Sequence, residues 1–140
     1  MIFFAADGHY GARPGWNVYE CLKNSFPDMV FTENDWKPFT ALNLSRDCDL
    51  VILSLIAGTN DVPPPGDAEA AALKAYCETG KPLLLHHGGS AAMWQYPWFR
   101  EMVGFRWVRP NDPDNVEKSV HPKNLLWCVR PKPGTCLLSL

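Results

Sequence analysis

The chain has 140 residues, 46% hydrophobic and 20% charged, which is enough to bury a core and is typical of one folded domain. Its net charge of −2 gives no electrostatic reason to bind nucleic acid or an acidic membrane surface. No apolar run approaches the roughly 20 residues that a membrane span needs. We therefore expect a single cytoplasmic domain over residues 1–140 that binds neither nucleic acid nor membranes.

The first half of the chain alternates strand-like and helix-like segments. The expected elements are a strand at Ile2–Ala6, a loop at 7–15, a helix at Trp16–Phe26, a short strand at Met29–Thr32, and at 35–47 a loop with one helical turn. Asp7 and His9 then follow the first strand. Parallel α/β sheets bind ligands at the carboxyl ends of their strands, so both side chains are placed for a site.

The second half continues the same alternation. The expected elements are a buried strand at Asp49–Leu55, a loop at 56–65, a helix from Gly66 or Asp67 to Thr79, a strand at 82–85, a helix at Ser90–Val103 with a break possible at Pro97, a strand at Phe105–Val108, a loop at 109–118, and two strands at Leu125–Val129 and Thr135–Leu140. This order predicts a flavodoxin-like three-layer α/β/α sandwich with a mostly parallel sheet. No GxGxxG or Walker pattern occurs, which argues against a nucleotide site.

The most informative stretch runs from Lys81 to Ser90. Three leucines form a continuous apolar run that suits a central parallel strand covered on both faces. His86 and His87 stand where this strand should end, and Gly88 and Gly89 follow before helix-forming sequence resumes. The pattern predicts a strand, a tight turn and a helix, with histidine at the turn.

The block from Lys81 to Gly104, with His121-Pro122 further on, resembles the ThuA-like family, named for a trehalose-utilisation protein. The matching residues are His87-Gly88-Gly89-Ser90-Ala91-Ala92, Trp94, Tyr96-Pro97-Trp98-Phe99 and Glu101-Met102-Val103-Gly104. The resemblance implies the class I glutamine amidotransferase fold and a role in carbohydrate metabolism. Members of that family usually continue well past the His-Pro element, so this chain is short for the family at its C-terminus.

Glutaminase activity is not expected. In class I amidotransferases a cysteine stands at the strand-to-helix elbow and a downstream histidine and glutamate activate it. The resemblance puts His87 at the elbow, with no cysteine within nine residues, and Lys123 stands where the carboxylate would be.

His87, His9 and Asp7 are the candidate catalytic residues. A neutral imidazole at an elbow can accept a proton, orient a substrate hydroxyl or bind a metal. The three residues together could form an open metal site, a metal-free substrate site, or no site at all if His87 only hydrogen-bonds a backbone carbonyl in the turn. No particular cofactor follows from the sequence.

Five further residues are candidates for substrate binding: His86, Gly88, Gly89, Ser90 and Trp94. Each has a structural alternative as well. His86 points to the opposite side of the strand and can be a packed core histidine, Ser90 can cap the following helix, and Trp94 can belong to the core. Asn60 and Asp61 could face the site, although turn hydrogen bonds are the simpler interpretation.

Two functions from different classes are compatible with these residues. The first is an enzyme acting on a sugar, and the alternative is a non-catalytic module that binds a small molecule or a protein. The five cysteines lack a CxxC pair, which favours buried reduced thiols. A shortened domain would leave a sheet edge uncovered, so we expect a homodimer in which the C-terminal strands take part.

Overall fold

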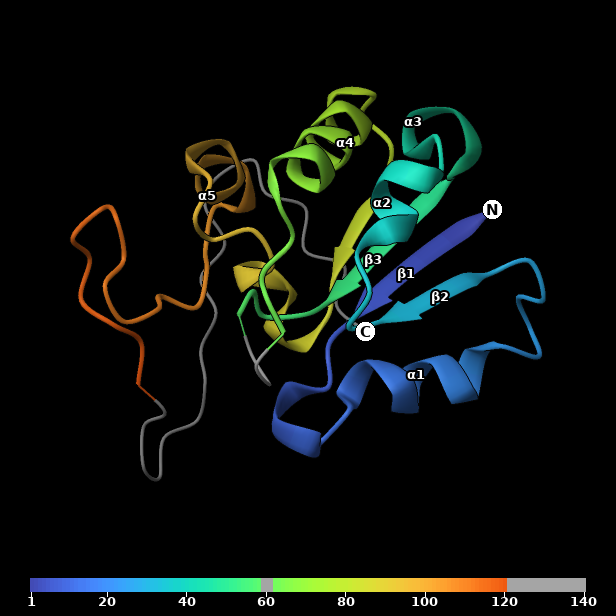
Figure 1. Ribbon diagram of the computed structural model, residues 1–140, viewed down its shortest axis with the longest axis horizontal. Coiled ribbons are helices and arrows are strands. Elements are labelled where there is room, and N and C mark those ends of the chain that lie inside the picture. Colours follow the sequence, from blue (N-terminus) through green and yellow to red (C-terminus); the bar gives the residue numbers. More distant parts are fainter. Residues whose placement is uncertain (59–61, 121–140) are drawn as a thin grey trace.

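A computed structural model describes residues 1–58 and 62–120 of the chain (Figure 1). The helices and strands alternate along this part of the chain. They are β1 (Ile2–Ala6), a 3-10 turn η1 (His9–Gly11), α1 (Pro14–Leu22), β2 (Val30–Glu33), α2 (Lys37–Ala41), α3 (Leu44–Asp47), β3 (Leu50–Ser54), α4 (Asp67–Glu78), β4 (Leu83–Leu85), a 3-10 turn η2 (His87–Ala91) and α5 (Pro97–Val103). Among the described residues no helix is both long and apolar enough to cross a membrane.

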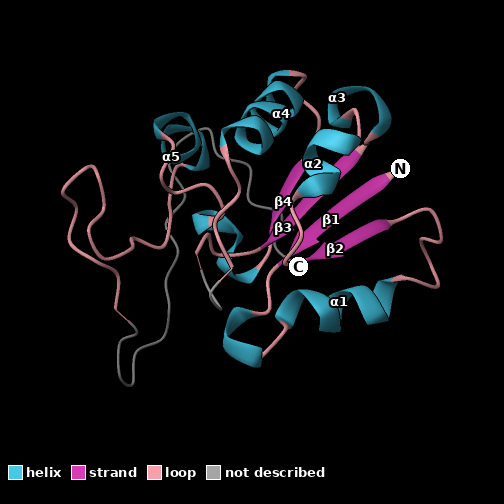
Figure 2. Ribbon diagram, in the orientation of Figure 1, coloured by secondary structure: helices cyan, strands magenta, loops and turns pink. Residues whose placement is uncertain are grey.

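The described strands form one parallel sheet in the order β2-β1-β3-β4. Helix α1 lies on one face of the sheet, and α2, α3 and α4 lie on the other (Figure 2). The expected α/β fold with a parallel sheet is therefore confirmed. The two central strands, β1 and β3, are buried almost throughout because helices cover both of their faces.

Two apolar clusters fill the space between the sheet and its helices. The larger lies under α2–α4 and includes Phe3, Val51 and Leu53 from the strands with Phe39 and Leu73 from the helices. The smaller lies under α1 and is built on Phe4 and Ile52. Successive strand residues therefore point into opposite layers, as the pleat of a strand requires.

The prediction that residues 82–85 form a central strand is wrong for the described sheet. β4 pairs with β3 on one side and lies at the edge of the four strands. Leu83 and Leu85 pack against the larger cluster, whereas Leu84 points to the opposite face of the sheet and is 42% exposed. A continuous apolar run does not distinguish an edge strand from a central one.

The predicted helix at 90–103, with a possible break at Pro97, is correct only from Pro97 onward. A 3-10 turn begins at His87, turns follow, and α5 begins only at Pro97. Pro97 suits the first helical position, and it holds Tyr96 in an extended conformation that a helix cannot include. Pro38 likewise stands in the first turn of α2, where its missing N–H costs no hydrogen bond. Residues 35–47 therefore contain two short helices, α2 and α3, where a loop with one helical turn was expected.

Residues 105–108 were expected to form a strand and do not. The backbone N–H of Trp107 donates to Ser90 Oγ at 3.3 Å, and that of Val108 donates to Ser119 Oγ at 2.9 Å. Side-chain hydroxyls thus satisfy the donors that a neighbouring strand would otherwise take. The two strands predicted at 125–129 and 135–140 lie outside the described residues, as do Asn60, Asp61 and His121.

The turn after β4 packs directly onto the end of β3, and Gly89 makes this possible. A Cβ added at Gly89 would lie 2.1 Å from the backbone oxygen of Leu53. A backbone oxygen cannot move away as a flexible side chain can. Only glycine therefore fits this position without displacing the turn.

Replacing Gly89 with alanine should destabilise the fold by about 2 kcal/mol or more, because the added methyl overlaps a buried backbone group. The midpoint of urea unfolding measures this change. Gly66→Ala is the matched control, since its Cβ would meet only the flexible end of Glu69 at 3.0 Å. Equal unfolding midpoints for the two variants would contradict the packing described here.

Candidate functional site

A cavity of about 460 Å³ opens at the carboxyl ends of the strands. His9, Tyr10, Ile56, His87, Gly88, Trp107 and Arg109 line it. These residues come from the segments after β1, β3 and β4 and from the chain after α5. In the order β2-β1-β3-β4 the chain passes from β1 to its neighbour β2 on one side, and from β3 to its neighbour β4 on the other. Parallel sheets bind ligands at such a switch point, where the connections diverge.

His9 and His87 face each other across this cavity. Their ring centroids are 4.3 Å apart and the rings are nearly perpendicular, at 81°. The segments after β1 and β4 supply one ring each, so the contact joins the ends of two strands that are not neighbours in the sheet. The sequence-based expectation that these two histidines lie close together is correct.

Both histidines have a backbone conformation that L-residues rarely adopt. The φ angle is 42° at His9 and 50° at His87. A non-glycine residue in this left-handed region costs of the order of 1 kcal/mol and persists where the surrounding structure holds it. At His87 it also turns the chain sharply from β4 into η2, so the imidazole is exposed at the tip of a strand-to-helix elbow.

Asp7 is fully buried behind His9. Its Oδ2 accepts a hydrogen bond of 2.7 Å from the backbone N–H of Ile56, and its Oδ1 lies 4.0 Å from Nδ1 of His9. The second distance is beyond that of a hydrogen bond, so the carboxylate acts on the imidazole through its charge. Asp7 therefore supports the site from below, and it does not line the cavity.

The electrostatics keep His9 neutral at physiological pH. Burial lowers the pKa of His9 below its usual value, and the charge on His87 lowers it further. Asp7 raises this pKa and Arg109 lowers it, with smaller effects. A neutral imidazole offers one hydrogen-bond donor and one acceptor, which suits it to hydroxyl groups.

His86 lies on the other side of the elbow. Its Nδ1 is 2.9 Å from Ser54 Oγ at the end of β3. Burial, followed by the charge on His87, lowers the pKa of His86 as well. This contact corresponds to the structural alternative for His86, a hydrogen-bonded histidine at the edge of the core.

The other predicted binding residues have separate positions. Gly88 lines the cavity, where a Cβ would lie 2.3 Å from the Ile56 side chain, whereas Gly89 is packed on Leu53. Ser90 accepts the Trp107 N–H, and Trp94 Nε1 donates to the Ala57 carbonyl at 3.5 Å. Of the aromatic residues described, Tyr10 and Trp107 line the cavity, and Trp94 does not.

Sequence reasoning missed Tyr10, Ile56, Trp107 and Arg109. Tyr10 could have been found, because it follows His9 in the same loop. Trp107 and Arg109 carry no such signal, since they come from a segment that folds back over the elbow from beyond α5.

The metal alternative finds little support in this geometry. Within residues 1–58 and 62–120 no group of three or more His, Cys, Asp or Glu side chains is placed to hold a metal ion. Asp7 is turned toward the Ile56 backbone, so His9, His87 and Asp7 do not converge on one point.

No family model, no curated protein and no solved structure matches the chain. The resemblance to the ThuA-like family therefore stays a prediction that rests on residues 81–104.

Substitutions that change one charge at a time should shift the histidine pKa values in opposite directions. His87→Ala should raise the pKa of both His9 and His86, because the His87 charge lowers each of them. Asp7→Asn should lower the pKa of His9 alone and keep an acceptor for Ile56. Proton NMR titration of the histidine ring signals measures both effects, and an unchanged His9 pKa in both variants would contradict this geometry.

Proposed function

We propose that the chain is a carbohydrate-active protein of the ThuA-like type, with its site in the cavity between His9 and His87. The observation that carries this proposal is the pair of histidines held 4.3 Å apart, each in a strained left-handed conformation, at the mouth of a cavity of about 460 Å³. Strained backbone of this kind clusters at functional sites. A volume of this size suits a small ligand.

The walls of the cavity suit a sugar. Tyr10, which is 68% exposed, and Trp107 provide aromatic surface against which the apolar face of a sugar ring can pack. The imidazoles provide donors and acceptors for hydroxyl groups. An aromatic lining with a small number of polar groups is the usual composition of a small-molecule site.

His87 is the proposed proton acceptor, because it stands exposed at the elbow, and His9 is the group that positions the substrate hydroxyl beside it. The strand order β2-β1-β3-β4 supports the flavodoxin-like and amidotransferase-like form of the fold, since the flavodoxin-like order begins in the same way.

A cysteine-dependent glutaminase reaction is not part of the proposal. Burial raises the pKa of Cys77 to about 11, and it raises the pKa of Cys48 too. Both thiols are thus protonated at neutral pH and poor nucleophiles. Neither residue lines the cavity.

One observation favours the alternative, a non-catalytic binding module. Within the described residues no carboxylate forms an ion pair with His87, and Asp7 lies beside His9 at 4.0 Å, so the proposed base lacks the oriented carboxylate that usually supports a general base. An enzyme and a binding module differ in one measurable property, which is turnover.

His87→Ala separates the two functions. For an enzyme we expect the turnover of trehalose or a related disaccharide, followed by NMR, to fall by about 100-fold or more while binding changes little. Lys74→Ala, on the exposed face of α4, is the control for a surface substitution. Failure of the unaltered chain to bind any mono- or disaccharide would contradict the proposal, and binding without turnover would favour the binding module.

We also propose that the chain forms a homodimer. In the described part of the sheet β4 has a neighbouring strand on one side only, and Leu84 exposes apolar surface beside that edge. Exposed strand edges of this kind favour pairing. The C-terminal strands expected to take part lie outside the described residues, and a cytoplasmic location likewise stays a prediction.

Light scattering of the full chain at micromolar concentration should give the mass of a dimer. Leu84→Lys should shift the mass toward that of a monomer, because a charge at the edge opposes pairing. Thr40→Lys, at an exposed position on α2, is the control. A monomeric mass for the unaltered chain would contradict the dimer.

A further inference from the structure

Arg109 differs from the other described arginines, because the described part of the chain offers it no carboxylate partner. The ion pairs of the others are Arg13 with Glu33, Arg46 with Asp47, Arg100 with Asp114, and Arg106 with Asp112 and Asp114. Within residues 1–58 and 62–120 no acidic side chain forms an ion pair with Arg109, and its buried Nε has no hydrogen-bond partner there. A half-buried guanidinium without a partner is costly, which makes its position informative.

Arg109 lines the same cavity as His9 and His87. Among the described residues no acidic side chain lines this cavity, since the Asp7 carboxylate beside His9 is turned toward the Ile56 backbone. The positive charge of Arg109 lies close enough to His9 to lower the pKa of that histidine. The cavity therefore combines one cation with two imidazoles and aromatic rings.

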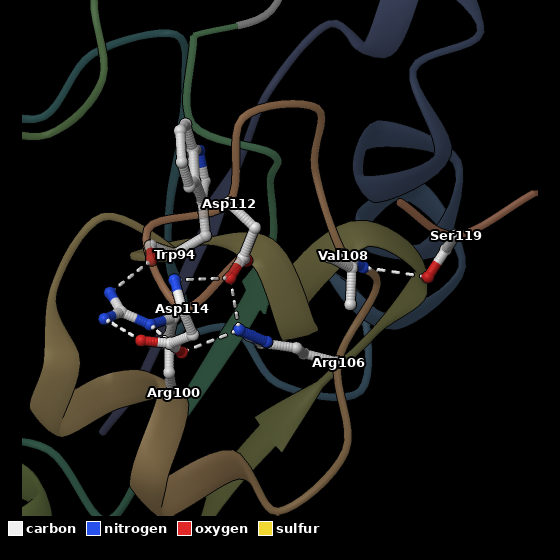
Figure 3. A network of polar contacts seen from close by, with 7 residues as sticks. All are labelled: Trp94, Arg100, Arg106, Val108, Asp112, Asp114 and Ser119. Atoms are coloured by element: carbon white, nitrogen blue, oxygen red, sulfur yellow. Dashed lines mark hydrogen bonds and ion pairs between the residues drawn. The ribbon is translucent and has the colours of Figure 1, made fainter. Parts of the chain in front are cut away.

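The segment that carries Arg109 is fixed by hydrogen bonds on both sides. The Trp107 N–H donates to Ser90 in the elbow turn. The Val108 N–H donates to the Ser119 hydroxyl (Figure 3), and the Ser119 N–H donates to the Val108 carbonyl. Arg106, three residues earlier, is held by Asp112 and Asp114. A guanidinium on such a braced segment is preorganised for a ligand.

A second cavity, of about 600 Å³ beside α5, shows the contrast. Arg100 and Arg106 line it as well, but Asp114 also lies there and forms ion pairs with both, while Asp112 supplies a second carboxylate to Arg106 (Figure 3). Those arginines hold the chain after α5 in place and have no charge left for a ligand. Arg109 has no such constraint from the described residues.

We propose that the ligand of the His9/His87 cavity carries an oxyanion, a carboxylate or a phosphate group, which Arg109 binds. This inference rests on the proposed function. If the ligand is a carbohydrate, it is a sugar acid or a sugar phosphate in preference to a neutral sugar. The guanidinium donates paired hydrogen bonds to two oxygens of the anion, and the N–H groups of the imidazoles can donate to the same oxygens or, in a phosphate, to a third. The anion thereby gives Arg109 the partner that the described residues do not provide.

Calorimetric titration of the full chain with glucose, glucuronate, glucose 6-phosphate and inorganic phosphate tests this proposal. We expect one of the two anionic sugars to bind at least about tenfold more tightly than glucose. Arg109→Gln should lower the affinity for that anionic sugar by between about 10-fold and 100-fold and leave the affinity for glucose unchanged. Arg46→Gln, which removes an exposed paired arginine, is the matched control and should change nothing.

Arg109→Lys distinguishes the two kinds of anion. Lysine keeps the positive charge but lacks the planar pair of donors that the guanidinium offers. The affinity for a carboxylate held by two parallel hydrogen bonds should therefore fall more than the affinity for a phosphate. Thermal unfolding of each variant, compared with the unaltered chain, confirms that the proteins are folded.

The outcomes separate this inference from the proposed function. Two results would contradict the oxyanion proposal while leaving the carbohydrate site standing. One is equal affinity for glucose and the anionic sugars, and the other is a preference for the anionic sugars that persists in Arg109→Gln. Binding of inorganic phosphate that depends on Arg109, with no sugar bound, supports the oxyanion and contradicts the carbohydrate. No binding of any of the four probes overturns the oxyanion and leaves the carbohydrate site to be decided by the disaccharide measurements above.

Discussion

The hydrogen bond from the Ile56 backbone to the buried Asp7 carboxylate is the contact on which the functional end of this molecule depends. It spans 2.7 Å and joins the segments that leave β1 and β3, the two central strands. The chain diverges at this point, and the backbone N–H of Asp7 also donates to Ser54, the last residue of β3. A charge-assisted bond shielded from water is worth about 1.5–3 kcal/mol, enough to hold two diverging loops in one arrangement.

The position of the histidines follows from this joint. His9 is two residues beyond Asp7, so fixing Asp7 fixes the loop that carries the imidazole. Ile56 in turn contacts the elbow, since a side chain at Gly88 would overlap it. The elbow can approach because Gly88 and Gly89 have no side chains, and His87 is thereby brought to within 4.3 Å of His9. Strain at the two histidines is stored locally and balanced by packing around them.

The charges of the site are separated into layers. The Asp7 carboxylate is buried beneath, the imidazoles of His9 and His87 line the cavity, and the Arg109 cation comes from the segment after α5. The ion pairs of Arg100 and Arg106 hold that segment, so their contribution is to place a third arginine. A site built in this way favours ligands that bring both hydroxyl groups and negative charge.

Several features of the chain could be predicted from local chemistry alone. The apolar runs at 2–6, 50–54 and 83–85 predicted the strands of the sheet, and the glycines after His87 predicted a tight turn. Because parallel strands end at the same edge of a sheet, the order of elements also brought Asp7, His9 and His87 together. The order of the elements along the chain and the geometry of a parallel sheet were therefore sufficient to predict that these residues lie near one another.

Other features depended on contacts between distant segments. An apolar strand has the same sequence pattern at the edge of a sheet as in its centre. Leu84 is exposed because the order β2-β1-β3-β4 places its strand at the edge of the described sheet. Residues 105–108 have the composition of a strand, yet the hydroxyls of Ser90 and Ser119 take their donors. The sequence by itself thus determined the sheet, the elbow and the facing histidines, since these follow from local propensity and strand direction. The tertiary structure alone decided that Trp107 and Arg109 complete the cavity, because their places depend on side-chain contacts with residues far away along the chain.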